Sequence, residues 1–398
     1  MGTTNRRTGA RAGIAARSAA AHGQAGQDGQ DGQVLEQALH DVFGLRSLRP
    51  GQREVVDRIL AGRSTLAVMP TGAGKSLCYQ LPAVLMEGCA VVVSPLIALM
   101  KDQCEKLLSH GVMAVQLNSH CSAREIHAAE SAISEGSARI VLTTPERMTQ
   151  TGFVALLRNR GITLLCVDEA HCISQWGHDF RPAFLEIETA LQALGCPTVL
   201  ALTATASAAV SKEIMARLNI PADGCVDTGT YRPNLHYAVE PLEDETARNR
   251  RLLELVAETE GSGIVYTATV KVAEEVHSRL RAAGHGTGLY HGRRTAAERR
   301  AAQDAFMSGA DRVMVATNAF GMGIDKPDIR FVVHYQIPSG LDAYYQESGR
   351  AGRDGEPATC ALLFLPRDKA VQQFFMAGRY PDARELEAVY TALLHGDA

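Results

Sequence analysis

The sequence predicts an α/β protein made of mostly parallel sheets flanked by helices, preceded by a disordered tail. Short apolar runs rich in β-branched residues alternate along the chain with stretches of helical periodicity. A length of 398 residues is enough for two or three domains, each with a sizeable core. Glycine-rich or acidic turns follow several of the apolar runs, where open sheets of this class place their ligands. We therefore expect successive parallel-sheet lobes with a site at their strand ends.

The first segment, residues 1–33, is the expected tail. It is rich in Ala, Gly, Gln and Arg and has almost no large apolar residue, so it cannot bury enough surface to order itself. Its arginines precede the first acid, Asp28, a pattern that an organelle transit peptide would share. We favour a flexible basic tail.

Composition limits the function classes. The net charge of −4 gives no global basic field, so nucleic-acid binding would require a local groove. The nine cysteines are scattered with no Cys-x-x-Cys pair, which predicts neither a zinc site nor a disulfide framework. The expected setting is a reducing cytoplasm, and no stretch approaches the length of a transmembrane helix.

The strongest motif is a glycine-rich turn of the phosphate-binding type. Residues 64–69 predict a buried strand before it, and residues 77–85 predict a helix after it. Strand, glycine-rich turn and helix are the context that this motif requires. The turn is Pro70-Thr71-Gly72-Ala73-Gly74-Lys75-Ser76.

The residues of this turn suit a nucleoside triphosphate. Gly72 and Gly74 let the backbone approach phosphate closely, and the following helix presents free N–H groups. Lys75 would reach the β- and γ-phosphates, and Ser76 would hold Mg²⁺. The longer form of the motif has glycine where this chain has Met69.

A second motif, Asp168-Glu169-Ala170-His171, follows the predicted strand 161–167. Asp168 would bind Mg²⁺, directly or through water, and Glu169 would orient or deprotonate the attacking water. Together with the phosphate turn, this pair of carboxylates predicts ATP hydrolysis.

Two further segments add to the site. Gln52 lies in the segment 43–52, and its amide has the donor and acceptor that read adenine N6 and N7. Arg350 and Arg353 follow a predicted helix and lie on one helical face. Two arginines in this arrangement suit a γ-phosphate reached from a second domain.

The second half of the chain continues the alternation. Residues 264–266, 312–316 and 329–333 predict strands, and residues 270–283 predict an amphipathic helix. Residues 240–245 predict an exposed connection. The arginines at 293, 294, 299 and 300 leave two interpretations open, contact with DNA phosphates or a solvated helix face.

The chain resembles the RecQ family of superfamily 2 DNA helicases. The most specific stretch is Asp168-Glu169-Ala170-His171-Cys172-Ile173-Ser174-Gln175-Trp176-Gly177-His178-Asp179-Phe180-Arg181-Pro182, and the resemblance covers about residues 38–368. It implies two tandem RecA-like lobes and an ATP- and Mg²⁺-dependent DNA helicase. By the same resemblance the motor would move 3′ to 5′ in DNA repair and recombination. Its partners would be single-stranded and forked DNA, with single-strand-binding or recombination proteins possible and no membrane.

The resemblance also implies roles for individual residues. It assigns adenine binding to Arg49 and Gln52, and it assigns ATP hydrolysis to Lys75, Ser76, Asp168, Glu169, Gln346, Arg350 and Arg353, with Arg353 as the arginine finger. Its DNA-contacting positions in the first lobe are Ser94, Pro95, Thr144 and the aromatic-rich loop with Trp176, His178, Phe180 and Arg181, which senses single-stranded DNA. In this pattern Thr203 and Thr205 couple the lobes, and the segment 316–325, with Thr317 and Asp325, touches DNA and nucleotide.

The expected divisions are a tail (1–33), an ATP-binding lobe (34–228), a second lobe (229–370) and a helical fragment (371–398). The family commonly continues into a four-cysteine zinc module and a winged helix. Neither is present here, so either the chain is truncated or this member uses something else, and we expect no zinc. Strand-separating power is the property that this ending affects most.

Three departures from the family pattern are local. Leu45 stands where the family has an aromatic residue for adenine, Ala268-Thr269-Val270 replaces Asn-Ser-Arg, and Gly292-Arg293 replaces Ala-Gly. Two alternative functions stay open, the first because DEAD-box-like RNA helicases share the phosphate turn and the two-lobe plan, and the second because of the ending. One is an RNA helicase, and the other is an ATP-switched nucleic-acid clamp or annealing factor with weak unwinding.

Overall fold

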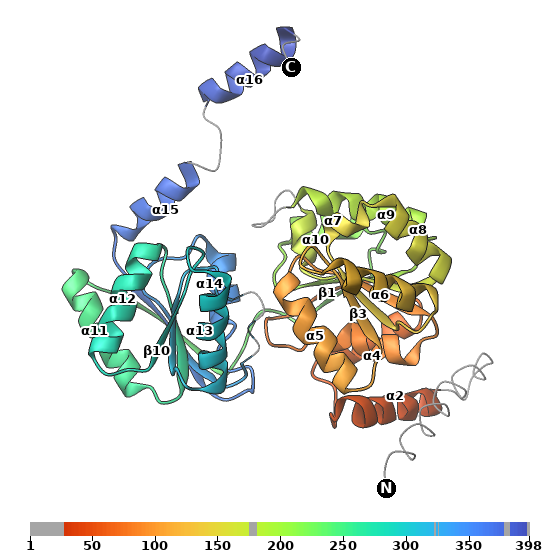
Figure 1. The fold of residues 1–398 in the computed structure, drawn as a ribbon. Coiled ribbons are helices and arrows are strands. Elements are labelled where there is room, and N and C mark those ends of the chain that lie inside the picture. The colour runs from red at the N-terminus through yellow and green to blue at the C-terminus, as the bar shows by residue number, and fades with distance from the viewer. Residues whose placement is uncertain (1–27, 175–180, 322–323, 325, 378–382, 396–398) are drawn as a thin grey trace. The chain divides into compact units, whose positions relative to one another are not determined.

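The computed structural model describes residues 28–174, 181–321, 324, 326–377 and 383–395. The chain divides into two compact units, Met1–Tyr231 and Arg232–Ala398. Each unit is a parallel sheet flanked by helices, which confirms the predicted fold class (Figure 1). The division falls between Tyr231 and Arg232, where the sequence placed it after residue 228.

The first unit contains a seven-stranded sheet with the order β3-β4-β2-β5-β6-β1-β7, and all its pairings are parallel. Strands β1, β2, β4 and most of β5 and β6 are buried, because helices cover both faces of the sheet. The strands are β1 (Thr65–Val68), β2 (Cys89–Val93), β3 (Ala114–Leu117), β4 (Ile140–Thr143), β5 (Ile162–Val167), β6 (Thr198–Thr203) and β7 (Cys225–Asp227).

Two apolar layers hold the helices of this unit. One layer joins α6 (Ala123–Ser134), α8 (Thr151–Arg160), α9 (Ile187–Ala193) and α10 (Ala208–Arg217) to the sheet. The opposite layer joins α3 (Gln52–Leu60), α4 (Leu77–Leu85) and α5 (Ile97–Ser109). The remaining elements are α7 (Pro145–Met148) and the short helices η1 (Ala170–Ile173) and η2 (Pro182–Glu186).

The first described helix, α2 (Asp28–Phe43), begins inside the segment that the sequence assigned to the tail. Leu35, Ala38 and Leu39 are buried, and they pack with Leu77 and Leu81 of α4. This packing depends on contacts between α2 and α4, which the composition of the tail does not indicate. The composition of residues 28–33 therefore gave no sign of helix.

The second unit contains a six-stranded sheet with the order β10-β11-β9-β12-β13-β8, again with parallel pairings. Its strands are β8 (Leu235–Pro241), β9 (Ser262–Tyr266), β10 (Thr287–Tyr290), β11 (Val313–Ala316), β12 (Ile329–His334) and β13 (Ala358–Phe364). Its helices are α11 (Glu245–Glu258), α12 (Val270–Ala282), α13 (Ala296–Ser308), α14 (Leu341–Ser348), α15 (Asp368–Ala377) and α16 (Ala383–His395). Among the helices of the described residues, none is long and apolar enough to cross a bilayer.

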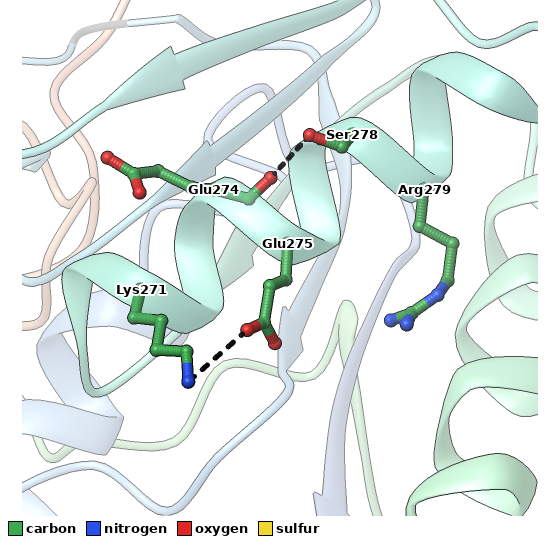
Figure 2. A pocket seen from close by; sticks show the side chains of 5 residues that line it. All are labelled: Lys271, Glu274, Glu275, Ser278 and Arg279. Carbon is green, nitrogen blue, oxygen red and sulfur yellow. Dashed lines mark hydrogen bonds and ion pairs between the residues drawn. The ribbon is translucent and has the colours of Figure 1, made fainter.

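The outer face of α12 carries a shallow polar depression (Figure 2). The side chains that line it are Lys271, Glu274, Glu275, Ser278 and Arg279. Lys271 Nζ lies 3.9 Å from Glu275 Oε1, and Ser278 Oγ donates to the backbone oxygen of Glu274 at 2.8 Å. These are contacts within one helix turn, so the depression has the character of a solvated helix face, and we assign it no function.

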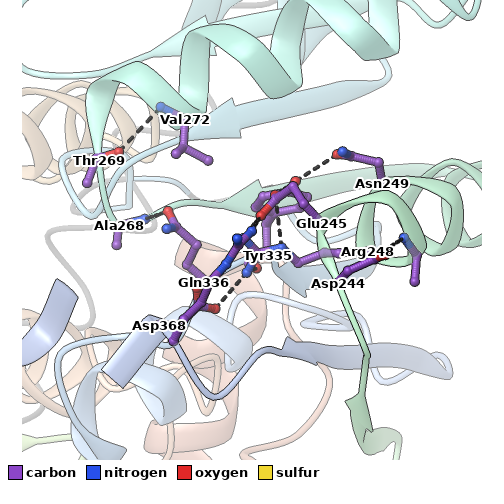
Figure 3. A network of polar contacts seen from close by, with 12 residues as sticks. Asp244, Glu245, Arg248, Asn249, Ala268, Thr269, Val272, Tyr335, Gln336 and Asp368 are labelled. Atoms are coloured by element: carbon purple, nitrogen blue, oxygen red, sulfur yellow. Dashed lines mark hydrogen bonds and ion pairs between the residues drawn. The ribbon is translucent and has the colours of Figure 1, made fainter. Parts of the chain in front are cut away.

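A buried polar network joins α11 to the start of α15 (Figure 3). Arg248 is 2% exposed, and its Nη1 donates to Asp368 Oδ2 at 2.6 Å and to the backbone oxygen of Tyr335 at 3.0 Å. Its Nη2 also donates to both carboxylate oxygens of Glu245. The guanidinium lies 4.3 Å from the centroid of the Tyr335 ring. Asp368 thereby ties the first turn of α15 to the lobe.

Candidate nucleotide-binding and catalytic site

The phosphate turn connects β1 to α4, as the sequence predicted. Gly72 and Gly74 have φ angles of 85° and 76°, a left-handed backbone that favours glycine. A Cβ atom on Gly74 would lie 2.6 Å from Nε2 of Gln52. Glycine at position 74 is therefore required by both the backbone and the packing of its neighbour.

Gln52 braces this turn from the first residue of α3. Its Nε2 donates to the backbone oxygens of Ala73 and Gly74 at 2.9 and 3.0 Å. Its Oε1 accepts from the backbone N–H of Arg49 at 2.7 Å, and the Arg49 guanidinium donates to the Gly72 backbone oxygen. Sequence reasoning missed this bracing, and the predicted contact of Arg49 and Gln52 with adenine stays a prediction.

Lys75 and Ser76 end the turn. Lys75 Nζ donates to the backbone oxygens of Met69 at 3.2 Å and of Pro70 at 3.5 Å. The Ser76 hydroxyl accepts from Gln103 Nε2 at 3.4 Å, and the buried Tyr79 donates to Gln103 Oε1 at 2.6 Å. The family resemblance implies that Gln103 belongs to a DNA-contacting motif, Lys101-Asp102-Gln103, and it gave no sign of a contact with Ser76. Its place behind Ser76 depends on α5 packing beside α4, which no local pattern shows.

Asp168 lies at the end of β5, beside the end of β2. Its backbone N–H donates to the Val93 oxygen at 2.8 Å, and its Oδ2 accepts from the Ser94 hydroxyl at 3.1 Å. Burial raises the pKa of the Asp168 carboxyl to about 6, the Glu169 charge adds to the shift, and Lys75 opposes it. Ser94 is 4% exposed, so its hydroxyl serves Asp168 in this arrangement, and its predicted DNA contact stays a prediction.

Glu169 has φ 50° and ψ 46°, a left-handed conformation that non-glycine residues seldom adopt. Its Oε2 is buried without a hydrogen bond and lies 3.4 Å from Nδ1 of His171. The same His171 nitrogen lies 3.1 Å from the Thr203 hydroxyl, which donates to the Thr205 backbone oxygen at 2.9 Å. The acidic motif and the Thr203–Thr205 segment, predicted from separate stretches, therefore meet at the ends of β5 and β6.

The residues of this site fit Mg²⁺ bound together with a nucleotide. The Ser76 hydroxyl and the Asp168 carboxylate supply hard oxygen donors, and the unpaired Glu169 oxygen can accept from a water. Among the described residues, no group of three or more His, Cys, Asp or Glu side chains could hold a metal by itself. Mg²⁺ usually keeps waters and takes phosphate oxygens, so two protein ligands are sufficient.

In the second unit, Gln346 lies on α14, and Arg350 and Arg353 lie in the turn that follows it. The Arg350 guanidinium donates to the Gly321 backbone oxygen. A Cβ atom on Gly321 would lie 2.5 Å from the same guanidinium. The arginine turn is thus held against the segment that contains Thr317, which is 7% exposed.

The structure describes some of the remaining predicted site residues and leaves others outside the described ranges. Thr144 is buried at the N-terminus of α7, and Arg181 donates its backbone N–H to the Cys172 oxygen at 3.1 Å. Pro95 is half-buried after β2. Trp176, His178, Phe180 and Asp325 lie outside the described residues.

Comparison with known proteins covers both units. A family model described as DEAD/DEAH box helicase matches residues 49–214, and one described as helicase conserved C-terminal domain matches residues 247–355. A probable ATP-dependent DNA helicase RecS of Bacillus subtilis is 37% identical over 361 residues, which cover 90% of this chain and 72% of that protein. The chain belongs to the RecQ family of ATP-dependent DNA helicases. This membership confirms the resemblance inferred from residues 168–182.

Relatives named RecQ are also similar over most of this chain. The RecQ helicase of Bacillus subtilis is 44% identical over 349 residues, which cover 86% of this chain and 58% of the relative. The RecQ helicase of Pasteurella multocida is 38% identical over 359 residues, covering 90% and 56%. The chain thus spans a little over half the length of these RecQ helicases.

Solved helicase structures share the fold. The helicase MrfA bound to DNA matches with a TM-score of 0.69 and 20% identity, over 85% of this chain and 49% of that chain. Dbp5 of Saccharomyces cerevisiae bound to RNA and ADP BeF3 matches with a TM-score of 0.66 and 20% identity, over 85% and 91%. At this identity the match establishes two tandem RecA-like lobes and nothing about substrate.

Proposed function

We propose that this RecQ-family chain is an ATP- and Mg²⁺-dependent motor that moves 3′ to 5′ along single-stranded DNA and separates duplex DNA ahead of it. The observation that carries the proposal is the assembled first-lobe site. The phosphate turn with Lys75 and Ser76 and the carboxylates Asp168 and Glu169 occupy the same edge of one sheet, within a chain of this family.

Hydrolysis would use these residues in separate roles. Lys75 would leave the carbonyls of Met69 and Pro70 to bind the β- and γ-phosphates. Ser76 and Asp168 would hold Mg²⁺, which neutralises charge that develops on the phosphates. Glu169 would orient the attacking water through its unpaired Oε2.

The second lobe would complete the chemistry. We assign Arg353 as the arginine finger, with Gln346 and Arg350 beside it, because an arginine in this role accelerates phosphoryl transfer by about 10³–10⁵. Asp325 would add a nucleotide contact. Repeated closing and opening of the lobes on a DNA strand would convert ATP turnover into steps.

DNA would be contacted along both lobes. Base stacking on Trp176 and Phe180 would contribute about 1–3 kcal/mol per base. The other proposed contacts come from Ser94, Pro95, Thr144, Arg181 and Thr317. Substrates would be single-stranded and forked DNA in repair and recombination, with single-strand-binding or recombination proteins as partners. We place this activity at the nucleoid in a bacterial cytoplasm, since the RecQ relatives described above come from bacteria.

The test is the ATPase rate with no nucleic acid, with single-stranded DNA and with single-stranded RNA of the same length. We expect DNA to stimulate the wild-type rate strongly. Lys75→Ala should abolish turnover, because the γ-phosphate loses its cation, and Trp176→Ala should keep basal turnover and lose stimulation. Lys212→Ala, an exposed lysine on α10, is the matched control and should behave as wild type.

Two other results of the ATPase experiment would favour the alternative functions. Stimulation by RNA alone would favour the RNA-helicase alternative. ATP binding without turnover would favour an ATP-switched clamp or annealing factor.

A further inference from the structure

Arg232, the first residue of the second unit, hydrogen-bonds the backbone of the turn that carries Arg350 and Arg353; we call this set of bonds the grip. Arg232 Nη1 donates to the backbone oxygen of Gly349 at 2.8 Å, and its Nη2 donates to that of Ala351 at 2.9 Å and to that of Gly352. Between 117 and 120 residues separate these partners along the chain. One guanidinium thus pairs with three of the four carbonyls between Gly349 and Gly352, just beyond the last turn of α14.

A second side chain from the same segment completes the grip. Asn234 Nδ2 donates to the backbone oxygens of Gly352 and Glu356, both at 2.8 Å, and the backbone oxygen of Asn234 accepts from the Ala358 N–H at 2.9 Å. Gly352 has a φ of 54°, and a Cβ atom there would lie 2.5 Å from Asn234 Nδ2. The backbone on both sides of Arg353 is therefore fixed by the segment that begins β8.

The backbone conformation of this turn sets the positions from which the side chains of Arg350 and Arg353 extend. A glycine-rich turn would otherwise sample several backbone conformations, because glycine populates positive and negative φ about equally. A misplacement of about 1 Å in a catalytic group can cost on the order of 10²-fold in rate. Arg350 is also held through Gly321, so the contacts of Arg232, Asn234 and Gly321 together fix the turn from which Arg353 extends.

We propose that Arg232 and Asn234 are positioning residues for Arg353. They fix the turn from which Arg353 extends, and they act on the chemical step of ATP hydrolysis rather than on nucleotide binding. This inference rests on the proposed function, since it takes Arg353 as the arginine finger.

Arg312, also in the second unit, is a matched control for the effect on stability of losing an arginine that binds backbone oxygens. Arg312 Nε donates to the Gly261 backbone oxygen and its Nη2 to that of Val256, both at 2.8 Å, with a further bond to Thr259. Arg312 therefore grips the end of α11 as Arg232 grips the end of α14. None of the partners of Arg312 belongs to the arginine turn.

The experiment compares Arg232→Lys, Asn234→Ala and Arg312→Lys for kcat and KM of DNA-stimulated ATP hydrolysis, Kd of a fluorescent ATP analogue, and Tm. Lysine keeps the charge and loses the planar fork. We expect the first two variants to lower kcat by about 10- to 100-fold with Kd within about twofold of wild type. Arg312→Lys should lower Tm to a similar extent and keep kcat.

A double variant, Arg232→Lys with Arg353→Ala, separates positioning from an independent effect. If Arg232 acts through Arg353, the double variant has the kcat of Arg353→Ala alone. If the fold loss in kcat of the double variant equals the product of the two single losses, the inference is overturned. A kcat loss in Arg312→Lys equal to that in Arg232→Lys would also overturn it. Asn234→Ala carries the same test if Arg232→Lys does not fold.

The finger role of Arg353 and the positioning role of Arg232 and Asn234 give different results in these variants. If Arg353→Ala keeps full DNA-stimulated turnover, the proposed finger role fails, and the inference falls with it. If Arg353→Ala removes stimulation while Arg232→Lys and Asn234→Ala keep it, only the positioning role is overturned.

Discussion

At the residue scale, Asp168 shows the conflict between stability and catalysis most clearly. In the proposed mechanism its carboxylate must be charged to hold Mg²⁺, yet burial and the neighbouring Glu169 favour the protonated form and raise its pKa to about 6 from 3.8. Folding therefore strengthens proton binding at this group. Its contribution to stability is full below about pH 4, the ordinary value, and is lost as pH rises through about 6.

This linkage predicts that Asp168→Asn stabilises the nucleotide-free, metal-free protein at pH 8 and has little effect near pH 4. Asp168 is half-buried as a residue, so we expect about 1–2 kcal/mol at pH 8, less than the full shift implies. Chemical unfolding in the presence of a chelator at several pH values measures this difference in stability. The control is Asp304→Asn, exposed on α13, which should leave the free energy of unfolding at pH 8 nearly unchanged. A loss of stability at pH 8 in Asp168→Asn would contradict the account.

Residues of the site differ in how well the sequence predicted them. Lys75, Ser76, Asp168 and Glu169 stand within short motifs, so strand-and-turn reasoning placed them at the correct edge of the sheet. Gln103 and Arg232 were not predicted in their structural roles, because their partners lie 27 and more than 100 residues away. Such contacts depend on how helices pack, which spacing along the chain does not encode.

At the element scale, the start of α15 depends on one ion pair. The side chains of Arg248 and Asp368 are each 3% exposed, and the pair lies 2.6 Å apart. Removing Asp368 leaves the buried Arg248 guanidinium with one carboxylate, that of Glu245, in place of two, and it takes away a charge-assisted hydrogen bond. The sequence ended the second lobe at residue 370, within α15, because nothing in the local pattern indicates that Asp368 binds back to α11.

We therefore predict that Asp368→Ala lowers the free energy of unfolding by about 2 kcal/mol, the cost of losing a buried hydrogen bond between charged groups. Urea unfolding monitored by circular dichroism measures the change. The control is Glu275→Ala, which removes an exposed ion pair with Lys271 and should cost well under about 1 kcal/mol. Equal costs for the two variants would show that the buried network does not anchor α15.

The strands of the second unit also differ in how well the sequence predicted them. The runs at 264–266, 312–316 and 329–333 were predicted because β9, β11 and β12 are interior strands with nearly continuous apolar burial. The edge strand β8 buries only its first residue, Leu235, and ends at Pro241, inside a stretch expected as an exposed connection. Edge strands satisfy fewer packing requirements, so their sequences carry a weaker pattern.

At the scale of the whole molecule, the fold and the family agree on the two-lobe core of a RecQ-family helicase. The alternation of strand and helix predicted successive parallel-sheet lobes, the family resemblance implied that there are two, and family membership adds the expectation of coupling to DNA. The small net charge of −4 means that DNA must be held by local contacts.

The most direct test of the central claim is ATP-dependent displacement of streptavidin from single-stranded DNA biotinylated at either its 5′ or its 3′ end. A motor that moves 3′ to 5′ should displace streptavidin from the 5′ end and leave the 3′ end occupied. Lys75→Ala should displace neither. Displacement from the 3′ end alone, or ATP hydrolysis with displacement from neither end, would contradict the proposal that this chain moves 3′ to 5′ along DNA.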